Sequence, residues 1–447
     1  MADKVNLGSG KQKIIVYLSL TVITLAAYWQ VNHFGFVNID DPYFVTSNSH
    51  IKKGLTPEVL GWAFSKTYDD YWMPLSRLSF MMDYRLYGLN AGGYHFHNLV
   101  LHILSTLMLF WLFHRMTGEI WKSAFVAAFF ALHPLHVEPV AWVSERKGLL
   151  NAFFWILTLC LYVRYTEKPA AGKYLLVILC FILAMMSKPT VIAMPFIMMF
   201  LDRWPLDRYK TVRGNPVLWQ LKEKGPFIIL SSIFSVITIF FTHDRPSAEY
   251  LPLTGRIANA AVSYAAYLEK TFWPRDMAVY YPFPGQIPFI HFAGAVLLII
   301  LISAALIIYV KRVPYLYTGW FWFVISLAPV IGIFQISLAA PFAMTDRYHY
   351  LPSIGIAAGL AWGMSALFSR HSPLRKILFP AAAFFLILMA AITWHQCRYW
   401  KNSVMLFSRA VQVTRDNALA YNNLAFALME EGKTREAIIH YSRAIRI

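Results

Sequence analysis

Long apolar runs alternate with short polar segments along most of the chain. A helix needs roughly 17–25 apolar residues to cross a hydrocarbon layer about 30 Å thick. Eleven runs approach this length, although several are short, above all the sixth. The predicted spans are Ile14–Val31, Phe96–Phe113, Lys122–Leu135, Leu149–Val163, Tyr174–Met186, Val191–Leu201, Pro226–Phe241, Phe289–Val310, Leu316–Phe334, Pro352–Phe368 and Ile377–Trp394.

Composition agrees with a chain built for lipid. Of 447 residues, 58% are hydrophobic and only 14% are charged. A soluble domain is about a quarter charged, so this chain has too few charges to cover a surface that faces water. The many aromatic residues exclude a disordered chain. Two of the three cysteines lie inside apolar runs, which does not support a disulfide framework or a cysteine metal site. We predict an all-α integral membrane protein.

The net charge of +17 is explained by the orientation of the chain in the membrane. Lys and Arg gather in alternate loops, and the rule that positive loops stay cytoplasmic places the N-terminus inside and the C-terminus outside. No nucleic-acid partner is needed to explain the charge. Two long segments, residues 32–95 and 242–288, then lie outside. Each predicts a helix: one over Thr56–Ser65, capped by Thr56 with Pro57 at its first position, and an amphipathic one over Arg256–Phe272.

The tail is polar and helical after Trp394. Its spacing of small and aromatic residues matches a tetratricopeptide repeat at Tyr421, Leu424, Ala425, Leu428, Gly432, Ala437, Tyr441 and Ala444. An ordinary amphipathic hairpin is the alternative. We therefore divide the chain into a membrane domain, residues 1–394, and repeat helices on the outer side, residues 395–447. So few repeats need a neighbour to pack on, in this chain or in another protein.

Polar residues gather at the outer ends of the predicted spans, whereas the cytoplasmic loops show only solvated basic runs. Asp40 and Asp41 follow the first span. They are either solvated loop acids or functional groups, namely a general base or a metal ligand. His95, Asn98 and His102 share one helical face. Their side chains could form hydrogen bonds between helices or, for the histidines, bind a metal ion. A transporter would place such groups near the midplane. The asymmetry favours an outward-facing active site that takes a substrate embedded in lipid.

The motifs IDDP, PLSRLSFMMDYRLYGL, GYHFHNL, HPLHVEPVAWVSERKGLL, SKPT and TDRYHYLPSIG occur in this order before the tail. The chain thereby resembles the transmembrane and tetratricopeptide-repeat-containing O-mannosyltransferases and their bacterial relatives, which are GT-C glycosyltransferases. The resemblance implies transfer of a sugar, with mannose as one candidate, from a polyprenyl-phosphate donor. The acceptor would be a hydroxyl of a protein or glycan on the non-cytoplasmic face, and the configuration would invert.

The resemblance places the catalytic acid in the first outer loop, at Asp40 or Asp41, and we favour Asp41 as the general base. The donor phosphate needs fixed positive charge and hydrogen-bond donors. The candidates in the outer loops are Arg347, Lys147, Arg146, Lys188, His349, Tyr280 and Tyr281. Simple ion pairs, Arg347 with Asp346 and Arg146 with Glu145, are the alternative. For the acceptor or sugar pocket we name Arg77, His95, His97, His136 and Glu138.

We expect no metal cofactor, although Asp41 with His136 or Glu138 would suit a divalent cation or, equally, a salt-bridged turn. The expected location is a bacterial inner membrane, with the tail in the periplasm and available for protein contacts. Two other functions stay open: a transporter or flippase of a lipid-linked headgroup, and a non-catalytic envelope scaffold that uses the tail.

Overall fold

The computed structural model describes residues 7–65, 72–210, 214–242, 252–333, 342–368 and 372–447. Parts of both outer segments and the end of the ninth predicted span fall outside these ranges. Among the described residues, six helices are long and apolar enough to cross a membrane, or seven if one bent pair counts as a span. The protein is therefore a helical, multi-pass membrane protein, but the eleven predicted spans are not confirmed.

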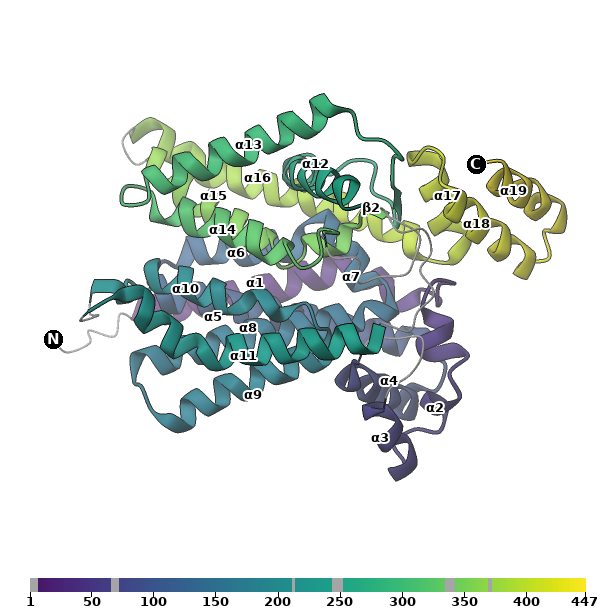
Figure 1. The fold of residues 1–447 in the computed structure, drawn as a ribbon, viewed down its shortest axis with the longest axis horizontal. Coiled ribbons are helices and arrows are strands. Elements are labelled where there is room, and N and C mark those ends of the chain that lie inside the picture. Colours follow the sequence, from purple (N-terminus) through teal and green to yellow (C-terminus); the bar gives the residue numbers. More distant parts are fainter. Residues whose placement is uncertain (1–6, 66–71, 211–213, 243–251, 334–341, 369–371) are drawn as a thin grey trace.

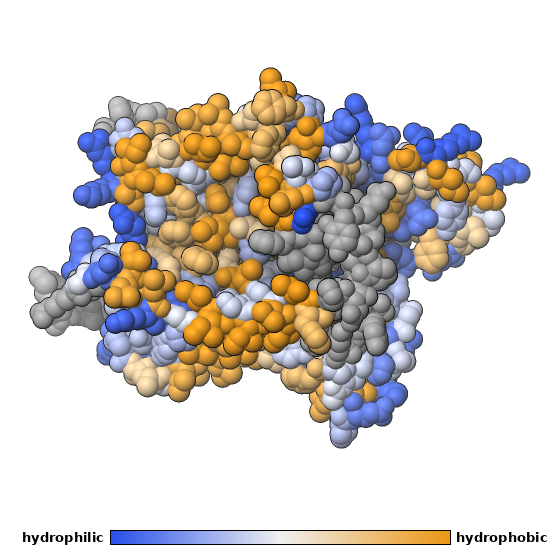
Figure 2. Space-filling view, in the orientation of Figure 1, coloured by the Kyte–Doolittle hydropathy of each residue, from blue (hydrophilic) through white to orange (hydrophobic). Residues whose placement is uncertain are grey.

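Most helices form one elongated bundle, in which they run side by side (Figure 1). The bundle helices are α1 (Leu7–Tyr28), α5 (Ala91–Thr117), α6 (Ile120–Leu132), α8 (Arg146–Glu167), α9 (Ala171–Ser187), α10 (Met194–Arg203), α11 (Pro216–Thr242), α13 (Phe289–Ile308), α14 (Pro314–Leu327), α15 (Ser353–Phe368) and α16 (Ser372–Cys397). The window of α13 that could span a membrane is only 6% buried, so its Leu and Ile side chains face outward. Figure 2 shows such apolar side chains over the middle of the molecule, with hydrophilic ones toward both ends.

Smaller helices gather at one end of the bundle (Figure 1). They are α2 (Ser49–Lys52), α3 (Pro57–Phe64) and α4 (Pro74–Tyr87) after the first bundle helix, and α17 (Ser403–Val413), α18 (Ala418–Glu430) and α19 (Thr434–Arg446) in the tail. Helix α12 (Leu253–Phe272) packs beside α13. A two-stranded antiparallel sheet joins β1 (Tyr281–Pro282) to β2 (Phe342–Met344). We call the end that carries α2–α4 and α17–α19 the outer end.

The two helices predicted in the outer segments are confirmed. Helix α3 has Pro57 at its first position, and the Thr56 hydroxyl accepts a hydrogen bond from the Val59 N–H at 3.4 Å. Such a cap satisfies one of the backbone donors that a helix start leaves unpaired. Helix α12 spans Leu253–Phe272, with Arg256 donating to the carbonyl of Ile333. These local signals were strong enough to be read without the fold.

The third predicted span, Lys122–Leu135, is not continuous. Helix α6 ends at Leu132, and the next helical segment, Pro134–Ala141, is bent from it by 54°. Pro134 has no N–H for the helix ladder, and His133 takes an extended conformation in which its Nδ1 accepts from the Leu135 N–H. The segment contains the short helix α7 (Val137–Ala141). This break turns His136 and Glu138 toward the loop that precedes α15.

The tail helices pack on one another and on the bundle. Helix α18 buries Tyr421, Leu424, Ala425 and Leu428, which are four of the predicted repeat positions, and α19 buries Ala437. The N–H of Gly35 donates to the carbonyl of Lys401, and the N–H of Asn38 donates to the Ser403 hydroxyl at 2.9 Å. The tail is therefore fastened to the loop after the first span, while its identity as a tetratricopeptide repeat stays a prediction.

Helices α14 and α15 approach closely at two glycines. A Cβ on Gly355 would lie 2.3 Å from the carbonyl oxygen of Gly319, and one on Gly319 would lie 2.4 Å from that of Gly355. Small residues at such crossings let two membrane helices pack backbone to backbone. This contact supports the start of α15 and hence the loop before it.

We expect Gly355→Ala to lower the melting temperature of the purified protein, because the added methyl must separate α14 from α15. Overpacking of this kind costs about 1–3 kcal/mol. Gly294→Ala in α13 is the matched control, since a Cβ there meets nothing within 4 Å. Thermal unfolding in detergent measures both. Equal melting temperatures for the two variants would contradict the close packing.

Candidate functional site

Six charged side chains meet at the outer end of the bundle, and we call them the outer charged cluster. They come from the loop after the first helix, from α7, from the start of α8, from the segment after α9 and from the loop before α15. The members are Asp40, Glu138, Glu145, Lys147, Lys188 and Arg347. Three are acids and three are basic residues, and burial raises the pKa of one of the acids, Glu138, to about 7 against the lowering effect of Arg347.

Each acid in the outer charged cluster has a cationic partner. Lys147 Nζ lies 2.9 Å from Asp40 Oδ2. Lys188 Nζ lies 3.2 Å from Glu145 Oε2. Arg347 bridges two acids, with Nη1 at 2.5 Å from Glu138 Oε1 and Nε at 3.5 Å from Glu145 Oε1. The ion pairs thus link elements that lie up to about two hundred residues apart in the chain.

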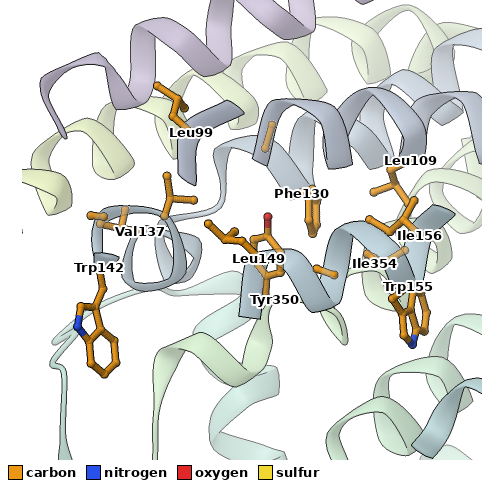
Figure 3. Packing of buried hydrophobic residues seen from close by; sticks show 14 of the residues in the cluster. Leu99, Leu109, Phe130, Val137, Trp142, Leu149, Trp155, Ile156, Tyr350 and Ile354 are labelled. Atoms are coloured by element: carbon orange, nitrogen blue, oxygen red, sulfur yellow. The ribbon is translucent and has the colours of Figure 1, made fainter. Parts of the chain in front are cut away.

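Trp142 joins the two halves of the cluster. Its ring centroid lies 5.5 Å from Lys147 Nζ and 5.4 Å from the guanidinium carbon of Arg347. A cation at this distance from an indole face is attracted by the ring quadrupole. Figure 3 shows Trp142 below the loop between α7 and α8, apart from the closely packed Leu149, Tyr350 and Phe130. The indole is therefore within cation–π distance of both Lys147 and Arg347.

Exposure separates the members of the cluster. The Asp40 side chain is 41% exposed, whereas those of Glu138 and Glu145 are 3% exposed. Burial alone would raise the pKa of Asp40, but the charge and hydrogen bond of Lys147, with the charges of Arg347 and Lys188, hold that pKa below its ordinary value. Asp40 is therefore an ionised carboxylate that solvent or a substrate can reach.

A pocket opens beside the cations, with a free volume of about 60 Å³. It is lined by Glu145, Lys188 and Arg347 from the cluster, and by Pro139, Gly148, Asn151, Thr190, Ser326, Val330, Tyr348, Tyr350, Leu351 and Pro352. The lining mixes charged, hydroxyl and apolar groups from α8, from the end of α14 and from the loop before α15. Such a pocket suits a small anionic group attached to an apolar chain.

Asp41 is placed very differently from Asp40. It is fully buried, and it accepts hydrogen bonds from the Val37 N–H at 2.9 Å, the Ser144 N–H at 3.0 Å and the Ser144 hydroxyl at 2.5 Å. Burial raises the pKa of Asp41 to about 6, against the lowering effect of these bonds. Both carboxylate oxygens are occupied, so the geometry makes Asp41 an anchor between two loops. Our preference for Asp41 as the base is not tested directly, but Asp40 has the better geometry.

Arg146 lies in a separate buried network. It pairs with Asp83 at 2.8 Å and donates to the Asn98 side chain, the Ser79 hydroxyl and the Tyr94 carbonyl. The alternative ion pair Arg146–Glu145 is wrong, because Glu145 instead faces Lys188 and Arg347. The alternative pair Arg347–Asp346 is wrong as well. Asp346 accepts from the Tyr281 hydroxyl at 2.9 Å, and burial raises the pKa of Asp346 to about 6.

Three residues that we predicted for the acceptor pocket have structural partners elsewhere, Arg77 and His97 in the layer formed by α2–α4 and His95 in the loop after the first helix. Arg77 donates to the carbonyls of Trp62, Ala63 and Ser65. His95 is buried and contacts the Gly35 carbonyl at 3.3 Å. His97 bonds to Asp83 and, at 3.0 Å, to the Tyr87 hydroxyl. These contacts do not bring them to the outer charged cluster.

The other predicted residues lie next to the cluster. Tyr280 is buried and stacks on Phe342 with 4.7 Å between ring centroids. Its backbone carbonyl accepts from Asn417 of the tail. His136 and His349 are both fully buried, with facing nitrogens 3.3 Å apart. Sequence reasoning did not assign Trp142 and Glu145 to the site, although both stand in the same motif as Lys147.

A second ion network lies near the far end of α8. Asp202 contacts Arg208 and Lys224, and Glu223 contacts Arg208 at 2.8 Å. The Tyr162 hydroxyl donates to Asp202. Tyr162 follows Lys147 by fifteen residues of one helix, which is roughly 22 Å. The expectation of only solvated basic runs at that end is therefore wrong.

Comparison with known proteins gives relatives along nearly the whole chain. The chain is 22% identical to protein O-mannosyl-transferase Tmtc3 of Drosophila melanogaster, over 98% of this chain and 56% of that protein. Identity is 23% to human TMTC1, over 91% of this chain and 52% of the relative, and 24% to mouse TMTC3, over 98% and 52%. The chain thus spans about half the length of these curated relatives.

Solved structures show only a distant similarity, and family models show none. Crystal structures of ArnT from Cupriavidus metallidurans align with 98% of this chain in the apo state, at 15% identity and a TM-score of 0.43. The form bound to undecaprenyl phosphate aligns with 96%, at 14% identity and a TM-score of 0.41. No protein-family model matches the chain. Along nearly its whole length the chain is therefore similar to the TMTC protein O-mannosyltransferases, in agreement with the resemblance of its sequence motifs.

Proposed function

We propose that this protein is a glycosyltransferase that moves a sugar from a polyprenyl-phosphate donor to an acceptor hydroxyl with inversion. The observation that carries the proposal is the outer charged cluster, in which an accessible, ionised Asp40 stands beside Lys147, Lys188 and Arg347. The names of the relatives, protein O-mannosyl-transferases, favour mannose as the sugar and a protein as the acceptor.

The cations are arranged for a lipid phosphate. Lys188 and Arg347 line the pocket between α8, α14 and the loop before α15, and their side chains are 16% and 12% exposed. Hydrogen bonds from Arg and Lys to phosphate are among the strong, charge-assisted ones. The pocket lies at the outer end of a bundle whose sides are apolar, so a polyprenyl chain can stay in the membrane while its headgroup enters.

In the proposed reaction Asp40 acts as the general base. The acceptor oxygen attacks the anomeric carbon, and its proton passes to an Asp40 carboxylate oxygen. The bond between the anomeric carbon and the phosphate oxygen breaks, and its electron pair stays on the phosphate. Attack opposite the leaving group inverts the anomeric configuration. The step as proposed uses only the side chains of the outer charged cluster.

During the proposed reaction one negative charge passes from the Lys147–Asp40 pair to the phosphate. Before reaction, Asp40 carries one negative charge and the phosphodiester of the donor carries another. After proton transfer, Asp40 is neutral and the phosphate carries both charges. Lys147 then no longer faces a carboxylate, so its positive charge acts on the leaving phosphate instead. Such stabilisation of developing charge in a shielded site is a large contribution to catalysis.

The tail lies where an acceptor would be presented. It contacts the loop that carries Asp40 through the backbone of Gly35 and Asn38, and it contacts Tyr280 through Asn417. We therefore keep the division into a membrane domain, residues 1–394, and tail helices, residues 395–447, which offer protein contacts. The proposed location is a bacterial inner membrane, with the N-terminus cytoplasmic and the outer end in the periplasm.

Asp40→Asn is expected to abolish sugar transfer in reconstituted vesicles supplied with polyprenyl-phosphate mannose labelled in the sugar. Loss of a general base typically costs about 10²–10⁴-fold in rate. Asp41→Asn is the matched variant. It places an amide NH₂ where Val37 N–H needs an acceptor, which costs roughly 1–3 kcal/mol, so it should lower the melting temperature while folded enzyme keeps more activity.

The opposite pattern, an active Asp40→Asn protein and a folded but inactive Asp41→Asn protein, would move the base to Asp41. Labelled lipid that crosses the bilayer without forming product would instead support a flippase. Transfer or binding that survives both substitutions and depends only on the tail would support a scaffold.

Lys147→Met is expected to move the acid limb of the kcat/KM profile to higher pH. Asp40 must be ionised to accept a proton, and Lys147 lowers the pKa of Asp40. Removing that positive charge raises the pKa, so activity is lost at a higher pH as the solution is acidified. Lys122→Met is the control, because Lys122 pairs with Glu119 at the other end of the bundle. An acid limb unchanged in Lys147→Met would show that Asp40 is not the titrating base.

A further inference from the structure

Three buried histidines form a cluster that the proposed reaction does not use. His133 stands at the break after α6, His136 follows it, and His349 lies in the loop before α15. All three are fully buried, and each offers one ring nitrogen such that the three nitrogens lie within 4.8 Å of one another. We call this set the histidine cluster.

The outer nitrogen of each ring is anchored on an oxygen. His133 Nε2 contacts the Thr271 carbonyl at 3.0 Å, and His136 Nδ1 contacts the Phe130 carbonyl at 2.7 Å. A carbonyl only accepts, so these two nitrogens carry the protons. His349 Nε2 lies 2.8 Å from the Thr271 hydroxyl, which itself lies 2.7 Å from the Tyr267 carbonyl and can donate there. Histidines that bind metals are oriented by just such partners.

His136 Nε2 faces His349 Nδ1, and both carry lone pairs when the Thr271 hydroxyl donates to Tyr267 and accepts from His349 Nε2. His136 Nε2 and His349 Nδ1 are 3.3 Å apart. Two nitrogens that each lie 2.0–2.1 Å from a tetrahedral zinc ion are separated by about 3.3 Å. With its Nε2 proton directed at the Thr271 carbonyl, His133 has its lone pair on Nδ1, which accepts from the Leu135 N–H at 3.2 Å and would exchange this bond for the ion.

We propose that His133, His136 and His349 bind one divalent transition-metal ion of the zinc class. Three neutral imidazoles without a thiolate suit zinc, copper or nickel better than magnesium or calcium, which prefer oxygen ligands. This ligand set differs from the one considered from sequence, which combined His136 with Glu138 and Asp41, and it departs from the expectation of no metal.

The ion would act as a clamp beside the outer charged cluster. His136 precedes Glu138 by two residues, and His349 follows Arg347 by two, so the ligands flank the Glu138–Arg347 ion pair on both of its segments. Thr271, the last-turn residue of α12, holds two of the rings. The ion therefore fixes the break after α6 to the loop before α15, and it positions Arg347 without touching substrate.

A metal-free hydrogen-bond chain is the competing state. In it the Thr271 hydroxyl turns from Tyr267 and donates to His349 Nε2, and His349 Nδ1–H donates to His136 Nε2. This chain satisfies the two rings without an ion. Direct metal binding separates the two states, and its readout does not depend on sugar transfer.

The test uses the full chain, stripped with a chelator in detergent and titrated with Zn²⁺ alone or Co²⁺ alone. We expect about one ion per chain and, for Co²⁺, the visible absorption of a tetrahedral nitrogen site without a thiolate charge-transfer band. Thr271→Val keeps the side-chain shape but removes the hydroxyl that accepts from His349. It should weaken Zn²⁺ affinity about 10–100-fold.

His349→Gln should lose the site, while His95→Gln, which removes a buried histidine outside the cluster, should bind Zn²⁺ like the wild type. Wild-type protein that binds no Zn²⁺ would overturn the proposal. So would equal Zn²⁺ affinity in wild-type, Thr271→Val and His349→Gln proteins, which would show adventitious binding elsewhere. The wild-type titration decides the matter even if a variant fails to fold.

Discussion

The double ion pair of Arg347 with Glu138 and Glu145 is the interaction on which the site depends. A carboxylate as deeply buried as that of Glu138 needs a cation beside it, because its loss of hydration costs several kcal/mol, and burial raises the pKa of Glu138 to about 7 even with Arg347 in place. Arg347 supplies that cation from a loop remote in sequence. The break after α6 and the start of α8 must therefore both meet this loop. This meeting also places Trp142 beside Lys147, and Lys147 beside Asp40.

The sequence was sufficient where a local rule decides the outcome. Thr56 and Pro57 predict the start of α3, and the apolar face of residues 256–272 predicts α12, because capping and periodicity act over a few residues. Asp40, Lys147, Lys188 and Arg347 were among the predicted site residues and lie near one another, whereas Arg146 from the same prediction does not, and their roles stay a prediction. Acids and cations stranded on short loops of an apolar chain have few other places to go.

The sequence was insufficient where neighbours in the chain face different ways. Glu145, Arg146 and Lys147 are consecutive, but successive residues of a helix point about 100° apart, so Arg146 reaches Asp83 while the other two join the cluster. Asp40 and Asp41 are the same residue type at adjacent positions, and only the folded structure shows that Asp41 is buried and Asp40 exposed. The prediction of a continuous third span was wrong for a similar reason: hydropathy measures apolar length, and it does not reveal a turn such as the one at His133.

Comparison of the two ion networks shows why the outer one is the better candidate for chemistry. At the far end of α8, Asp202 and Lys224 have no exposed surface, and Asp202 is bonded by Arg208, Lys224, Gln220 and Tyr162. Every acid there is held by more than one donor, so that network fastens α8, α10 and α11 together. In the outer cluster the Asp40 side chain is 41% exposed, and two of the three cations, Lys188 and Arg347, line a pocket. The same residue types thus hold helices together when they are enclosed, and the one carboxylate that stays accessible is the reason why we propose the outer cluster as the reactive site.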